Sequence, residues 1–192
     1  MVGADGFVDS RVKRSRAAVL TQTYELLSES GIGGVSIDEV ARRSGVAKTT
    51  IYRHWPSRAA LLIEACSTIG SAVDTPDTGS VVSDLAVVVE GLAEQLRTAR
   101  WAAVLPSIMD AAERDTDLAD LHAGLHSQLM APLATVIERA QARGEIAAGQ
   151  RPADVVAAVA GPLFYRRWFS REPVDDVFVA DLLRDTVARA LA

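Results

Sequence analysis

The sequence predicts an all-α fold of about nine helices, and three observations support that prediction. Apolar residues recur three and four positions apart along most of the 192 residues, which is the spacing of one face of an α-helix. Alanine, the residue with the highest helix propensity, is abundant. The alternation of apolar and polar residues that marks a half-buried strand is almost absent. We therefore expect a three-helix head at the N-terminus, followed by a longer helical body.

The segment SIDEVARRSGVAKTTIYRHWPSR, residues 36–58, has the pattern of two short helices joined by a tight turn. Ser36 followed three residues later by Glu39 is a capping box, which begins a helix. Gly45 ends that helix, because glycine adopts the positive φ of a sharp turn without steric cost. Pro56 closes the second helix. Two helices in this arrangement form a helix-turn-helix.

The second of these helices is rich in hydrogen-bond donors and contains no carboxylate. Donors of this kind pair with phosphates and with base edges in DNA. A plain helical hairpin with a solvated polar face is the alternative interpretation of the same pattern. The donor-bearing residues are Lys48, Thr49, Thr50, Tyr52, Arg53 and His54.

The distribution of charge separates the head from the rest of the chain. The formal net charge is −5, but residues 1–60 carry nine Lys and Arg against six Asp and Glu, whereas residues 61–192 carry eleven against nineteen. The cationic field therefore lies at the helix-turn-helix end, where a DNA partner requires it. A basic cluster over residues 11–16 could contact phosphates or could serve solubility alone.

The second helix and the turn after it resemble the recognition segment of TetR-type transcriptional regulators. The resemblance rests on the run Thr50-Ile-Tyr52-Arg-His54-Trp, then on Pro56-Ser-Arg58 and Leu61. Trp55 stands where that family usually has phenylalanine and Arg58 where it usually has lysine, and both replacements keep the chemistry. The resemblance implies a DNA-binding head over residues 1–56 and an effector-binding, dimerising body over residues 57–192.

The resemblance also implies two kinds of contact with double-stranded DNA. Residues near the N-terminus of a recognition helix reach deepest into the major groove. The expected base-edge or mixed readers are Lys48, Thr49, Thr50 and Arg53. The expected phosphate contacts come from Ser36, Tyr52 and His54, with core packing as the alternative for Tyr52.

The other elements are placed by apolar spacing and by the glycines and prolines between them. After a loose arm over residues 1–9, the first helix is expected to bury Ala17, Leu20, Tyr24 and Leu27 and to end at Gly31. The later helices are expected over 57–72, 81–98, 101–114, 117–143, 152–169 and 173–190, with 74–79 as a linker. We expect Pro106 to delay or bend its helix and Pro132 to kink or break its own. The helix over 57–72 is expected to be the only long element that connects head and body.

Large residues on the body's helices could form a core or could line a pocket for a small apolar ligand. TetR-type proteins carry an effector pocket there, so the resemblance implies a pocket in this chain. Its expected lining is Trp101, Leu105, Met109, His122, Leu125, His126, Leu129, Phe164, Tyr165 and Trp168. His122 and His126 lie on one helical face, but two histidines alone do not complete a metal site, so no metal is expected.

The last two helices carry more apolar surface than one face against the body requires, which predicts a homodimer. Two helices from each subunit would form a four-helix interface, and the two-fold symmetry would place both recognition helices on one palindromic site. The expected interface residues are Val155, Val159, Leu163, Phe178 and Leu182.

These observations predict a sequence-specific DNA-binding protein, and the resemblance implies a transcriptional repressor that a small-molecule effector releases from its operator. An activator or a ligand-independent regulator is the alternative. We expect neither an enzyme nor a cofactor, because the chain has no nucleophile elbow, Walker loop or dinucleotide fingerprint and Cys66 has no base nearby. A helical adaptor that binds only protein would leave the donor-rich helix unexplained.

A single cysteine, and no apolar run near the ~18 residues of a spanning helix, predict a cytoplasmic protein without a membrane partner.

Overall fold

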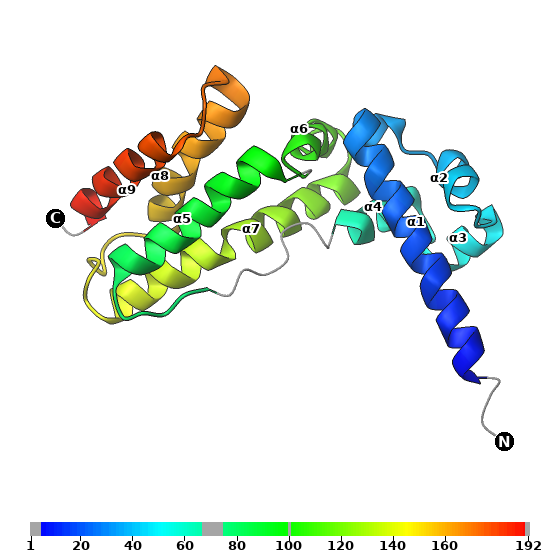
Figure 1. The fold of residues 1–192 in the computed structure, drawn as a ribbon, viewed down its shortest axis with the longest axis horizontal. Helices are drawn as coiled ribbons and strands as arrows, with labels where there is room; N and C mark the ends of the chain where they lie inside the picture. The colour runs from blue at the N-terminus through cyan, green and yellow to red at the C-terminus, as the bar shows by residue number, and fades with distance from the viewer. Residues whose placement is uncertain (1–4, 67–74, 100, 191–192) are drawn as a thin grey trace. The chain divides into compact units, whose positions relative to one another are not determined.

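A computed structural model of the protein describes residues 5–66, 75–99 and 101–190, which form helices and connecting segments without a strand (Figure 1). In these ranges the chain has nine α-helices and one π-helix. Their order is α1 Asp5–Gly34, α2 Ile37–Ser44, α3 Lys48–His54, α4 Arg58–Cys66, α5 Val81–Thr98, α6 Trp101–Ala112, α7 Thr116–Ala142, α8 Pro152–Phe164, the π-helix η1 Tyr165–Ser170 and α9 Asp176–Ala190. The predicted all-α class is confirmed. None of the helices in these ranges combines the length and the hydropathy needed to cross a membrane.

The chain divides into two compact units. The N-terminal unit comprises Met1–Ile69 and Ala103–Leu125, and the C-terminal unit comprises Gly70–Ala102 and His126–Ala192. Most of α6 and the first turns of α7 therefore belong with α1 to α4. The expected boundary after residue 56, which separates DNA binding from effector binding, remains a prediction.

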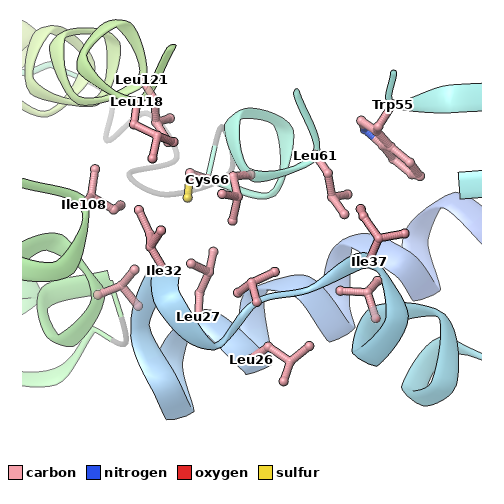
Figure 2. Packing of buried hydrophobic residues seen from close by; sticks show 14 of the residues in the cluster. Leu26, Leu27, Ile32, Ile37, Trp55, Leu61, Cys66, Ile108, Leu118 and Leu121 are labelled. Carbon is pink, nitrogen blue, oxygen red and sulfur yellow. The ribbon is translucent and has the colours of Figure 1, made fainter. Parts of the chain in front are cut away.

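The core of the N-terminal unit joins helices that are far apart in the sequence (Figure 2). Cys66 of α4 lies near Ile32 and Leu27 of α1 on one side and near Ile108 of α6 on another. Leu118 extends this core into α7. Burial of an aliphatic side chain of this size contributes about 1.5–3 kcal/mol, so α6 and α7 stabilise the head directly. The expectation that the helix after residue 57 alone connects to the head was therefore wrong.

Helix α1 differs from its prediction at both its start and its buried face. It already begins at Asp5, so residues 5–9 are helical and not a loose arm; residues 1–4 lie outside the described residues. Of the residues expected on the buried face, Leu27 is buried, Leu20 and Tyr24 are half-buried and Ala17 is exposed. The buried face also contains Val19, Thr23 and Leu26. The apolar spacing did not indicate this face because Thr23, a polar residue, occupies a core position. Its hydroxyl donates to the Val19 carbonyl at 2.8 Å.

Gly31 interrupts α1 as expected, and the structure supplies the reason. Its φ of 65° is favourable only for glycine, and a Cβ atom at this position would lie 3.1 Å from the Cβ atom of Ser107 in α6. The next residue, Ile32, donates its N–H to the Ser107 hydroxyl at 3.3 Å. Gly31 thus permits a close contact between α1 and α6 within the N-terminal unit.

Both internal prolines lie inside continuous helices. Helix α6 begins at Trp101 and passes through Pro106, and α7 passes through Pro132, so the expected late start and the expected break are wrong. The alternatives, a bend at Pro106 and a kink at Pro132, stay predictions. Proline leaves the carbonyl four residues earlier without its helical partner. In α6 that carbonyl belongs to Ala102, and the Trp168 indole N–H donates to it at 3.2 Å. A tertiary hydrogen bond therefore replaces the helical one.

The C-terminal unit packs α5 against α8 and α9, and α8 against α9. The helix expected over 152–169 is α-helical only to Phe164 and continues as η1. The last helix begins at Asp176, after Asp175 has accepted the Phe178 N–H at 2.9 Å. The expected helix over 57–72 is described only to Cys66, and its remainder lies outside the described residues.

Candidate nucleic-acid interface

Helix α2 is begun and ended by the two residues that the sequence indicated. The Ser36 hydroxyl accepts the Glu39 N–H at 3.1 Å, and Gly45, with φ 68°, donates its N–H to the Ala41 carbonyl at 3.0 Å. Only half of the capping box forms, because the Glu39 carboxylate accepts from the Arg42 and Arg43 guanidiniums at 2.8 Å each. Those hydrogen bonds lower the pKa of Glu39 to about 2.

Helix α3 is held by one apolar face and presents the other to solvent. Ile51 has no exposed surface, and Trp55, which ends the helix, is 2% exposed. Tyr52 is 51% exposed, so its ring is not part of the core. The other outward side chains are exposed at Lys48, Thr49 and Arg53 and half-buried at Thr50 and His54.

Two of the expected readers differ in their surroundings. Lys48 forms an ion pair with Asp38 of α2, and both side chains are more than half exposed. The Arg53 side chain forms no hydrogen bond or ion pair with any residue that the structure describes. Sequence reasoning missed the carboxylate beside Lys48 because it lies in the preceding helix, ten residues earlier. The Arg53 side chain is therefore available to an external acceptor, whereas Asp38 would compete with an external acceptor for Lys48.

The C-terminal end of α3 is fixed by a three-residue brace, defined here as Arg16 of α1, Trp55 and Glu64 of α4. The Trp55 indole N–H donates to Glu64 Oε2 at 2.9 Å, and the Arg16 guanidinium donates to both Glu64 oxygens at 2.8 and 2.6 Å. The Arg16 guanidinium carbon also lies 5.7 Å from the centre of the Trp55 ring. A phenylalanine at this position could not donate the hydrogen bond, so the departure from the usual family residue has a structural use.

Arg58, the second departure, is also a structural residue. Its Nε donates to the Val35 carbonyl at 2.7 Å, and its Nη2 donates to the Ile32 carbonyl. These carbonyls belong to the end of α1 and the segment before α2. A guanidinium can serve both acceptors at once because it presents several donors in one plane. Arg58 thus fixes the position of α2 from the first residue of α4.

This geometry suits a helix that enters the major groove of DNA. Seven residues make α3 about 10 Å long, and the major groove accommodates a single α-helix. Its outward face offers donors for phosphate oxygens and base edges, and α3 itself contains no carboxylate. The roles assigned to Ser36 and to the individual residues of α3 remain predictions.

The residues expected to line an effector pocket fall in both compact units. Leu105, Met109, His122 and Leu125 belong to the N-terminal unit, and the other members belong to the C-terminal unit: Trp101, His126, Leu129, Phe164, Tyr165 and Trp168. Trp101 and Leu125 are buried, whereas Met109, His126 and Tyr165 are exposed. Trp168 lines an open cavity of about 480 Å³ in the C-terminal unit. Among the described residues no three His, Cys, Asp or Glu side chains are grouped as metal ligands.

The residues expected at a dimer interface differ in how much surface they offer. Val159 and Leu163 have no exposed surface in the single chain, and Val155 is 8% exposed. Phe178 and Leu182 are half-buried and line a groove of about 580 Å³ beside Val155, between α8 and α9. The two α9 residues are thus the members of this set that a partner could contact without rearrangement of the chain.

A helix-turn-helix with an exposed donor face, followed by a helical body, defines a DNA-binding regulator, and comparison with known proteins gives its family. The family model described as bacterial regulatory proteins, tetR family, matches residues 19–65, and the model described as tetracyclin repressor-like, C-terminal domain, matches residues 75–186. The chain belongs to the TetR family of transcriptional regulators.

Individual relatives agree over nearly the whole chain. The HTH-type transcriptional regulator YdeS of Bacillus subtilis is 31% identical, over 90% of this chain and 88% of its own. The DNA-binding transcriptional repressor TetR of Mycobacteroides abscessus is 28% identical, over 93% and 94%. The crystal structure of the TetR family regulator SCO0332 superimposes with a TM-score of 0.68 at 31% identity, covering 91% of this chain and 97% of that one. This chain is accordingly a helix-turn-helix transcriptional regulator.

Proposed function

We propose that the protein is a homodimeric repressor that occupies a palindromic operator and is released by a small-molecule effector. The observation that carries the proposal is the exposed, donor-rich face of α3, held in place by the buried Ile51 and by the Arg16–Trp55–Glu64 brace. The repressor named in Mycobacteroides abscessus supports repression over activation. Action on DNA implies that the protein works in the cytoplasm.

On the operator, we assign base reading mainly to Arg53, because its guanidinium has no acceptor within the described residues. A guanidinium aimed at a guanine edge can donate two hydrogen bonds, to O6 and N7. Lys48 must exchange Asp38 for a phosphate or a base. That exchange offsets part of its contribution, so the loss on removing Lys48 should be smaller than the loss on removing Arg53.

Dimerisation through α8 and α9 brings two copies of α3 onto one duplex. Phe178 and Leu182 border the groove between these helices, and Val177 of α9 is 72% exposed. Apolar side chains exposed on a terminal helix favour association with a second copy related by two-fold symmetry. Two heads separated by about one helical turn of DNA, about 34 Å, would then read the two half-sites.

Effector binding would act by favouring a spacing of the heads that does not match the operator. The effector shifts this equilibrium only by its difference in affinity for the two spacings, and a 100-fold release requires about 2.7 kcal/mol. Ile108 of α6 and Leu118 of α7 pack in the head core together with α4. A change at the effector site could therefore act on the head through α4 or through α6 and α7.

The decisive experiment selects DNA from a random pool with the full-length protein and with an Arg53→Ala variant, and it sequences the bound molecules. The proposal expects an inverted repeat for the unaltered protein and, for the variant, the same repeat with relaxed preference at one position in each half-site. A pool without sequence enrichment would refute operator recognition. Enrichment of a single half-site would refute the proposed dimeric arrangement.

A further inference from the structure

An open cavity of about 480 Å³ in the C-terminal unit brings four arginines together: Arg97, Arg166, Arg167 and Arg171. Residues 70–102 and 126–192 contain ten arginines against thirteen carboxylates, a net charge of −3. The guanidiniums are thus concentrated at one place on a unit that is acidic as a whole. One carboxylate, that of Glu172, lies in the same lining.

Three of these arginines come from the π-helix and its end: Arg166 and Arg167 lie in η1, and Arg171 follows it. Arg166 and Arg171 are five residues apart, with Arg167 between them. Arg171 ends η1 with a φ of 57°, a left-handed conformation that favours glycine. Single π-turns and left-handed residues other than glycine both concentrate at functional sites.

The cavity walls are held by hydrogen bonds that leave donors unused. Arg167 Nε donates to the Leu96 carbonyl at 2.9 Å, and no described residue accepts from its terminal nitrogens. Arg166 Nη1 donates to the Pro173 carbonyl at 2.8 Å, and its guanidinium carbon lies 3.7 Å from the centre of the Phe178 ring. A guanidinium held in this way loses little conformational freedom when it binds an anion.

The internal carboxylates neutralise only part of this charge. Arg97 pairs with Asp176 at 2.8 Å, and Arg166 pairs with Glu172 at 3.4 Å. Arg167 and Arg171 have no carboxylate partner among the residues that the structure describes. Two guanidiniums therefore face the cavity without a counter-charge, which an anionic ligand would supply.

The remaining wall is apolar, and this decides what kind of anion fits. Leu96 is fully buried and Val174 is 6% exposed, and Trp168 is fixed by its hydrogen bond to the Ala102 carbonyl. A cavity of about 480 Å³ is far larger than an inorganic ion and lies within the range for small organic ligands. We propose that it binds an organic acid whose carboxylate pairs with Arg167 and Arg171 and whose apolar body packs against Trp168.

This inference rests on the proposed release by a small-molecule effector, and it gives that effector a chemical class and a place in the C-terminal unit. Its test uses the full-length protein without DNA and three acids, benzoate, 1-naphthoate and octanoate, each compared with the alcohol of the same carbon skeleton. Isothermal titration calorimetry should show at least one acid binding once per chain and about ten- to a hundredfold more tightly than its alcohol, since hydrogen bonds to charged groups have that strength.

Substitutions locate the binding. Arg171→Ala and Arg167→Ala should each weaken the acid about tenfold or more, and Glu172→Gln should tighten it by removing the competing carboxylate. Arg184→Ala, which removes an exposed arginine that pairs with Asp181 on α9, should leave the affinity unchanged. The Arg171 side chain forms no hydrogen bond with any residue that the structure describes, so its replacement tests the site even if Arg167→Ala destabilises the protein.

Three results would overturn the inference: no acid bound better than its alcohol, equal losses in Arg171→Ala and Arg184→Ala, or inorganic phosphate bound in place of every acid. Addition of the bound acid to the protein–operator complex separates this inference from induction. An acid that requires Arg171 but leaves the operator bound would keep the site and refute induction by that ligand. If the unaltered protein recognised its operator but bound none of the acids, the acid site would be refuted and operator recognition would stand.

Discussion

The brace between α3 and α4 gives the sharpest quantitative prediction. Trp55→Phe keeps an aromatic ring in the core but removes the indole N–H that donates to Glu64 at 2.9 Å. A hydrogen bond to an ionised group contributes about 1.5–3 kcal/mol, and the 29% exposure of the Glu64 side chain reduces this to about 1–2 kcal/mol. The smaller ring leaves unfilled space at a site that is 2% exposed, which adds about 1–2 kcal/mol. The variant should therefore lose about 2–4 kcal/mol of the free energy of unfolding.

A double-mutant cycle isolates the hydrogen bond from the packing. Unfolding in urea, followed by circular dichroism, is measured for Trp55→Phe, Glu64→Ala and the combination. The two changes should be coupled by about 1–2 kcal/mol, because either one alone breaks the same hydrogen bond. Glu39→Gln is the matched control, because the Glu39 carboxylate pairs with Arg42 and Arg43. Its loss of unfolding free energy should add to that of Trp55→Phe within about 0.5 kcal/mol. A coupling below about 0.3 kcal/mol between Trp55 and Glu64 would show that the brace does not hold α3.

The remaining predictions concern recognition, assembly and pH. Arg53→Ala should cost about 1–3 kcal/mol of operator binding and relax one position per half-site, whereas Tyr52→Phe should weaken all single-base operator variants alike; equal losses on every variant for both would contradict the assigned roles. Phe178→Asp combined with Leu182→Asp should sediment as a folded monomer with reduced operator affinity, and an unchanged dimer would place the interface elsewhere. The folded pKa of Glu39, about 2, lies below its ordinary value of 4.5, so its contribution to stability is present above about 4.5 and is lost as the pH falls toward 2. Acid unfolding of Glu39→Gln should lack this part of the pH dependence.

The recognition segment could be predicted from the sequence because its signals are local. The cap at Ser36, the turn at Gly45 and the buried Ile51 each act within a few residues, through hydrogen-bond geometry, backbone conformation and helical spacing. The same is true of the helical class, which follows from spacing along the whole chain. Helices α5 and α7 end at Thr98 and Ala142, at or one residue from their predicted ends, for this reason.

Features that join distant parts of the chain could not be predicted in this way. The Arg16–Glu64 pair spans 48 residues and the Ile32–Ser107 hydrogen bond spans 75, and no periodicity marks such partners. An indole N–H in the core does signal a need for an acceptor, but the sequence does not say which carboxylate supplies it.

The sequence by itself therefore determined the helical class, the helix-turn-helix and the residues on its outward face. Only the tertiary structure decided that α6 and the start of α7 share a core with the head, that Asp38 pairs with Lys48, and that Arg166, Arg167 and Arg171 line one cavity. The physical reason is the range of the interactions involved. Caps, turns and helical faces depend on neighbours within about four residues. Core membership, ion pairs between helices and the convergence of side chains on a cavity depend on which helices pack together, and many arrangements of the same helices satisfy the same local pattern.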